Sequence, residues 1–131
     1  LESLNQDYAR VADGISRQKG YLLDTVFQSP FRVMVYLLGT CILVPIEEEI
    51  FFRRLFYSAI RNRFGIRCGV AISSLTFGLV HLSSPILGIV MGVFLALIYE
   101  KHRNLLVNVM THGLVNFFVV IAKDIVVPYF N

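Results

Sequence analysis

Four long apolar stretches separated by short polar connections dominate the sequence from residue 31 onward. Their apolar side chains recur with helical spacing, which predicts helices over 31–60, 68–82, 86–100 and 105–122. Because the connections are short, successive helices should run antiparallel. A membrane span needs roughly 20 residues of helix. The pattern therefore predicts an all-α fold, a polytopic membrane helix bundle of about four core transmembrane helices.

The first 30 residues have a different pattern, with charged side chains interspersed among apolar ones at helical spacing. The apolar positions are Leu1, Leu4, Tyr8, Val11 and Ile15. They indicate either an amphipathic helix at the membrane interface or a solvated lead-in left from a truncated upstream element. Ser29-Pro30 then marks a break. We divide the chain into a lead-in (1–30), a membrane core (31–122) and a C-terminal tail (123–131).

Composition and charge agree with a membrane setting. Apolar residues make up 56% of the 131 residues and charged ones 16%, and the mean hydropathy is +0.66, whereas a soluble domain usually carries about 25% charged residues. The first and third connections between helices hold Arg61, Arg63, Arg67, Lys101 and Arg103. The positive-inside rule predicts that these two connections are cytosolic. No aromatic and basic surface for nucleic acid is evident.

Three polar motifs interrupt the apolar helices. They are Glu48-Glu49-x-x-x-Arg53, Phe77-x-x-x-His81 and His112-x-x-x-Asn116. Ionisable groups at membrane depth are costly and usually mark a functional site. With about 1.5 Å of rise per residue, Glu48 and His81 each lie about 20 Å from the basic side, and His112 and Asn116 about 12 and 18 Å from it. We therefore expect the motifs to meet in one layer inside the membrane.

The spacing within the first motif separates its two carboxylates. Glu49 and Arg53 lie on the same helix face, where each can neutralise the other. Glu48 points about 100° away and is free of that pair. Pro45 cannot donate a hydrogen bond to Cys41, so we expect a kink there that opens room for water.

The motifs resemble those of the CPBP family, the CAAX proteases and bacteriocin-processing enzymes that include the type II CAAX prenyl endopeptidases. The family's first motif, Glu-Glu-x-x-x-Arg with a preceding Pro and a Phe before the Arg, matches residues 45–53. The second and third motifs match residues 77–81 and 112–116 in the family's order. The resemblance covers residues 31–122. Arg54 departs from it, because many members have Gly there, and the departure concerns local packing.

This resemblance implies an intramembrane endopeptidase that hydrolyses a peptide bond near the membrane. Glu48, helped by His81, would take a proton from the attacking water. His112 and Asn116 would donate hydrogen bonds to the developing oxyanion.

Three supporting residues follow from the same resemblance. Glu49 and Arg53 would hold the first helix and the position of Glu48. Phe77 would shape the wall beside His81.

A zinc site could use some of the same side chains. Glu48, His81 and His112 could hold a divalent metal such as Zn²⁺ with a bound water in the fourth position. No His-Glu-x-x-His pattern is present, and Asn116 is a natural oxyanion donor but a poor zinc ligand. We therefore favour a glutamate-dependent mechanism without a cofactor over a metalloprotease.

Other functions can be read from the same residues. Buried histidines often serve helix packing, and intramembrane glutamates can serve a proton- or ion-coupled transporter, although the short chain shows no internal repeat. His81 and His112 could bind haem, which would leave the acidic motif unexplained. A catalytically silent immunity or scaffold protein is a further alternative. If the chain is a peptidase, its partners are the lipid bilayer and a peptide or protein, with either a prenylated C-terminus or a leader peptide.

Small residues and cysteines have structural interpretations. Gly88-x-x-x-Gly92 followed by Ala96 predicts close helix packing inside the bundle. Cys41 and Cys68 should differ in depth by about 30 Å, too far for a disulfide.

Overall fold

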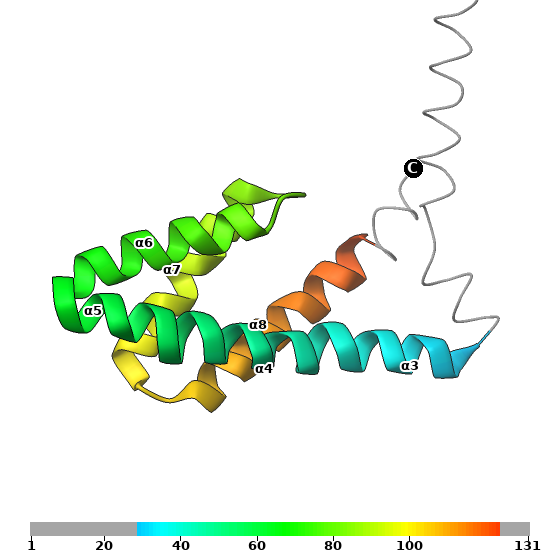
Figure 1. Ribbon diagram of the computed structural model, residues 1–131. Helices are drawn as coiled ribbons and strands as arrows, with labels where there is room; N and C mark the ends of the chain where they lie inside the picture. The colour runs from blue at the N-terminus through cyan, green and yellow to red at the C-terminus, as the bar shows by residue number, and fades with distance from the viewer. Residues whose placement is uncertain (1–28, 124–131) are drawn as a thin grey trace, which may run out of the picture.

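Residues 29–123 are described by a computed structural model in which every regular element is helical (Figure 1). The expected all-α helix bundle is confirmed, with four helical rods in this range. The amphipathic segment expected within 1–30 falls almost entirely outside the described residues. The C-terminal tail does so beyond residue 123.

The first rod is one continuous helix from Pro30 to Phe64. It contains α3 (Pro30–Leu38), the π-helical segment η1 (Gly39–Leu43), α4 (Val44–Glu49), a second π-helical segment η2 (Ile50–Tyr57) and α5 (Ser58–Phe64). The expected end at residue 60 was wrong, because the helix continues to Phe64. Gly65 has φ 87°, a value that favours glycine, and it alone turns the chain into the next helix.

The other three rods are α6 (Ile66–Val80), α7 (Pro85–His102) and α8 (Leu105–Ile121). Each agrees with its expected range to within about two residues, as helix ends usually do. One difference bears on function. His81, expected inside the second helix, lies just after α6 with φ −91° and ψ 62°. The side chain therefore leaves from the helix end and not from a helical face.

Glycines let α6 and α7 pack closely. A Cβ on Gly92 would lie 2.8 Å from the Cα of Ser74, and a Cβ on Gly88 would lie 2.9 Å from the Cα of Gly78. Ala96 is fully buried one turn farther along α7. The small-residue stripe thus serves packing inside the bundle, as expected. Cys41 and Cys68 are free, also as expected.

A polar cluster joins the first rod to α7 at the arginine-rich end of the bundle. Glu100 accepts hydrogen bonds from the Tyr57 hydroxyl at 2.5 Å, from Nη2 of Arg61 at 2.9 Å and from Nη2 of Arg103 at 2.6 Å. Tyr57 is fully buried and its ring packs against Tyr99. These contacts set how the first rod and α7 cross.

The outer surface of the rods is strongly apolar. Large apolar side chains are exposed on all of them, among them Phe31, Leu75, Ile86 and Leu106. Within the described residues one helix, α7, is both long and apolar enough to cross a membrane by itself, with a mean hydropathy of 1.4. α6 and α8 are shorter apolar helices. Exposed apolar surface of this extent indicates contact with lipid or with further protein.

Candidate active site

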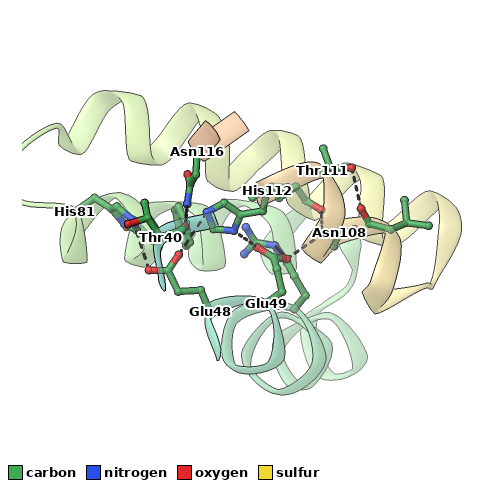
Figure 2. Close-up of polar contacts among 12 residues, drawn as sticks. Thr40, Glu48, Glu49, His81, Asn108, Thr111, His112 and Asn116 are labelled. Carbon is green, nitrogen blue, oxygen red and sulfur yellow. Dashed lines mark hydrogen bonds and ion pairs between the residues drawn. The ribbon is translucent and has the colours of Figure 1, made fainter. Parts of the chain in front are cut away.

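Glu48 lies between two histidines that come from distant parts of the chain. Its Oε1 is 3.7 Å from Nε2 of His81 and its Oε2 is 3.5 Å from Nε2 of His112. Figure 2 shows the carboxylate on α4, His81 beyond α6 and His112 on α8. The prediction that these side chains meet in one layer is confirmed. Glu48 is 25% exposed, and His112 is 5% exposed. The Glu48 side chain is therefore partly accessible, although its Oε2 is buried, and its neighbour His112 is enclosed.

The π-helical segment η1 brings α8 close to the first rod. It ends with the Val44 N–H donating to the carbonyl of Gly39, five residues back. The chain stays helical through Pro45, and this wider turn lies directly before it. A Cβ on Gly113 would overlap the carbonyl oxygen of Cys41, which Pro45 cannot satisfy. Close approach at Gly113 places His112 at the level of α4.

Asn116 is oriented by the same π-helical segment. Its Nδ2 donates to the carbonyl oxygen of Thr40 at 2.9 Å. A side-chain amide nitrogen has two hydrogens, so one remains for another acceptor. Asn116 lies four residues after His112 and lines the same pocket. The helix therefore presents an imidazole and an amide donor to one space.

Glu49 is the centre of a second, fully buried network. Its Oε2 forms the expected ion pair with Nε of Arg53 at 3.2 Å. The same oxygen accepts a hydrogen bond from Nδ2 of Asn108 at 3.0 Å, and Oε1 accepts one from Nδ1 of His112 at 3.0 Å. Sequence reasoning missed both of these contacts. A signal was present, because Asn108 lies four residues before His112 and thus on the same face of α8.

Phe77 lies directly beside His81, where the family resemblance placed it. The two rings lie 4.3 Å apart between centroids, and Nδ1 of His81 is 2.7 Å from the carbonyl oxygen of Phe77. The guanidinium carbon of Arg53 lies 5.1 Å from the centroid of the Phe77 ring. Since a carbonyl oxygen only accepts, the contact between Nδ1 of His81 and the Phe77 carbonyl places the hydrogen of His81 on Nδ1. Its Nε2 is left facing Glu48.

A pocket of about 180 Å³ opens beside these groups, between the start of α7 and the end of α8. Its polar lining includes His81, His112, Asn116 and Lys123. The apolar part is formed by Phe77, Leu87, Met91, Val115 and Val119. A cavity with an apolar wall and a few convergent polar groups is typical of a small-molecule or peptide site.

The fit of a metal ion can be judged from the same geometry. Both imidazoles give Nδ1 to an oxygen, as metal-bound histidines usually do. However, within residues 29–123 no three His, Cys, Asp or Glu side chains converge closely enough to hold a metal ion. The expected set of Glu48, His81 and His112 therefore does not form a zinc site as arranged.

Comparisons with known proteins place this geometry in a family. The chain is 32% identical over 104 residues to the Bacillus subtilis protein named "Putative membrane peptidase YdiL", an alignment covering 78% of this chain and 41% of that protein. It is 30% identical over 98 residues to the Lactococcus lactis UPF0177 protein YxdF, with coverage of 72% and 52%. The chain thus spans about half the length of these relatives.

No solved structure matches the chain significantly. The model of one protein family, described as Type II CAAX prenyl endopeptidase Rce1-like, matches residues 30–118. These residues contain all three polar motifs, the first three rods and most of α8. The chain is a membrane helix bundle that belongs to the Type II CAAX prenyl endopeptidase Rce1-like family.

Proposed function

We propose that the protein is an intramembrane endopeptidase in which Glu48 and His81 activate water. The observation that carries the proposal is the carboxylate of Glu48 held between two imidazole Nε2 atoms beside a pocket. Family membership and the similarity to a protein named as a membrane peptidase support the same reaction class.

The first chemical step is attack of water on the scissile carbonyl. Glu48 takes a proton from that water, and the new C–O bond pushes the carbonyl electrons onto oxygen. Asn116 then donates its free N–H to the oxyanion. Nδ1 of His112 is hydrogen-bonded to Glu49. When both ring nitrogens of His112 are protonated, Nε2 is therefore the nitrogen that donates to the oxyanion. One such donor contributes about 3 kcal/mol to transition-state stabilisation.

Collapse of the tetrahedral intermediate requires a proton for the leaving amine. Glu48 holds the proton taken from water, and Nε2 of His81 is 3.7 Å from its carboxylate. Either group can hand that proton to the amine nitrogen as the C–N bond breaks. The Nδ1 contact with Phe77 keeps the ring of His81 in place for this step.

The pocket supports a substrate with apolar side chains beside the scissile bond. Its wall is mostly aliphatic and aromatic, and the surrounding surface is suited to lipid. A prenylated C-terminus and a leader peptide both have this character, and we propose one of these two classes as substrate. The arginine-rich ends of the rods are proposed to be cytosolic.

A peptide library tests the reaction directly. Wild type, Glu48→Gln and Glu47→Gln proteins are reconstituted in liposomes and given peptides with and without a C-terminal prenyl-Cys, and cleavage is read by mass spectrometry. Glu47 is an exposed neighbour and serves as the matched control. We expect cuts by wild type and Glu47→Gln that Glu48→Gln does not make. Equal cutting by Glu48→Gln would refute the role of Glu48.

The same experiment addresses the other functions. If folded wild-type protein makes no cuts across the library, the peptidase proposal fails, and a silent immunity or scaffold role takes its place. Proton uptake by the same liposomes would instead favour a transporter, because the buried acidic motif would then serve ion coupling.

A further inference from the structure

Asn108 holds a position that the proposed reaction does not by itself explain. It is fully buried on α8 and bridges two other rods. Its Nδ2 donates to Oε2 of Glu49 at 3.0 Å and to the backbone oxygen of Leu95 at 2.8 Å. Both partners accept hydrogen bonds only, so both hydrogens of the amide are committed.

The orientation of this amide is fixed by its neighbours. Oδ1 of Asn108 has no hydrogen-bond partner among the described residues. A flip of the amide would place that oxygen against the Glu49 carboxylate and the Leu95 carbonyl, which are both acceptors. The observed orientation avoids this repulsion. Asn108 thus presents a donor, and only a donor, to Glu49.

The orientation of the Glu49 carboxylate determines which of its oxygens contacts His112. With Oε2 held by Asn108 and Arg53, the other carboxylate oxygen is directed at Nδ1 of His112. A carboxylate accepts, so Nδ1 must carry the hydrogen in this contact. Nε2 is then the nitrogen that faces Glu48 and the pocket. The nitrogen of His112 that carries the hydrogen is therefore determined by Glu49 and Asn108, which are buried more deeply than Glu48.

We propose that Glu49 and Asn108 together fix the protonated nitrogen of His112, which makes Asn108 a positioning residue of the active site. The importance of this arrangement for catalysis rests on the proposed function. The tautomer itself does not, since the contacts that determine it are present without substrate.

Nitrogen NMR of the full chain labelled with [15N]histidine tests the proposal. The sequence has three histidines, and the His112 signals are assigned by their loss in His112→Gln. Spectra are followed in micelles as the pH is raised until the ring is neutral. We expect wild-type His112 to keep its hydrogen on Nδ1. A neutral ring with the hydrogen on Nε2 would overturn the proposal.

Two variants of nearly unchanged side-chain size test the effects of Glu49 and Asn108 on the tautomer of His112. In Glu49→Gln, the amide oxygen should turn to the donors Arg53 and Asn108, and the NH₂ should face Nδ1 of His112. The hydrogen of the ring should then move to Nε2, an inverted tautomer. In Asn108→Leu, Glu49 loses one of its donors, and we expect a mixture of both tautomers.

Thr111→Val is the matched control for Asn108→Leu. Its hydroxyl donates to the Val107 carbonyl at 2.8 Å within α8 and does not reach Glu49. The control should keep the wild-type spectrum. Unchanged His112 signals in both test variants would overturn the proposal, and an unchanged spectrum in Asn108→Leu alone would remove Asn108 from it. Retained dispersion of the other histidine signals shows that each variant is folded.

Cleavage kinetics connect the tautomer to the reaction. If the wild type is a peptidase, Asn108→Leu should lower kcat with KM nearly unchanged, by about twofold when an even tautomer mixture halves the competent population and by up to about 100-fold when loss of the Asn108 donor also moves His112 by about 1 Å. A lower kcat with the wild-type tautomer would mean a merely structural role. If wild type cleaves nothing, the proposed function fails, while the NMR result still decides the tautomer.

Discussion

Replacing Gly88 by alanine should disturb the active site from outside its reacting groups. Gly88 lies on α7, opposite the end of α6 and His81. A Cβ at this position would be 2.9 Å from the Cα of Gly78 and 3.0 Å from the Cβ of His81, whereas ordinary contacts are 3.4–4 Å. Neither neighbour is the tip of a flexible side chain. α7 and the end of α6 must therefore separate by about 0.5 Å, because helix interfaces leave little free space.

The size of the effect follows from that displacement. Overpacking of this kind costs about 1–3 kcal/mol, and the better helix propensity of alanine returns up to about 1 kcal/mol. We expect a net loss of stability of about 1 kcal/mol. His81 moves with the backbone, and its Nε2 is 3.7 Å from Glu48 in the wild type. Since a 1 Å misplacement can cost about 100-fold, half of that displacement should lower kcat/KM about tenfold.

Gly39→Ala provides the matched control. Gly39 is also in a helix, with φ −59° and ψ −58°, and a Cβ there would meet no atom within 4 Å. It should retain wild-type cleavage and gain up to about 1 kcal/mol in stability. Both variants are compared in liposomes for cleavage and in detergent for thermal unfolding. Wild-type kcat/KM in a folded Gly88→Ala protein would refute the link between this packing and the position of His81.

Three further predictions concern other parts of the structure. Tyr57→Phe removes a hydrogen bond to Glu100 and should lower the free energy of unfolding by about 1.5 kcal/mol. Tyr99→Phe in the same cluster should change the free energy of unfolding little, and unfolding curves in detergent compare the two variants. Asn116→Ala should reduce kcat by about 10²- to 10³-fold with a smaller change in KM, and unchanged kcat would exclude Asn116 as an oxyanion donor. Dialysis of the liposome-reconstituted enzyme against a strong zinc chelator should leave its cleavage rate unchanged, and loss of activity restored by Zn²⁺ would establish the metalloprotease mechanism instead.

The meeting of Glu48, His81 and His112 could be predicted because the rise of a helix is fixed. Counting residues from one membrane side gives the level of each group without knowing how the helices are arranged. The helix ends were less predictable. Gly65 alone replaces an expected seven-residue connection, and whether a charged run such as 61–64 remains helical depends on the contact of Arg61 with Glu100, 39 residues away.

The network around Glu49 could not be predicted in full. The i,i+4 relation identifies Arg53 as its partner within one helix. Its contacts with Asn108 and His112 depend on how far α8 is rotated about its own axis and how closely it approaches η1. That approach requires Gly113 and the π-helical turn, neither of which has a sequence pattern that sets an interhelical distance. The same limit applies to the bond between Asn116 and Thr40.

The two adjacent glutamates illustrate why the first motif contains a pair. Neighbouring helical residues point about 100° apart, so only one of the two can face the centre of the bundle. Glu49 does so, and it is fully buried among Arg53, Asn108 and His112. Glu48 is left 25% exposed, with the Nε2 atoms of His81 and His112 at 3.7 and 3.5 Å from its oxygens. A carboxylate surrounded by fixed donors is suited to holding other groups in place, whereas one beside a pocket can exchange protons. The 100° turn between adjacent helical positions is therefore enough to give Glu49 a positioning role and Glu48 a role in proton transfer.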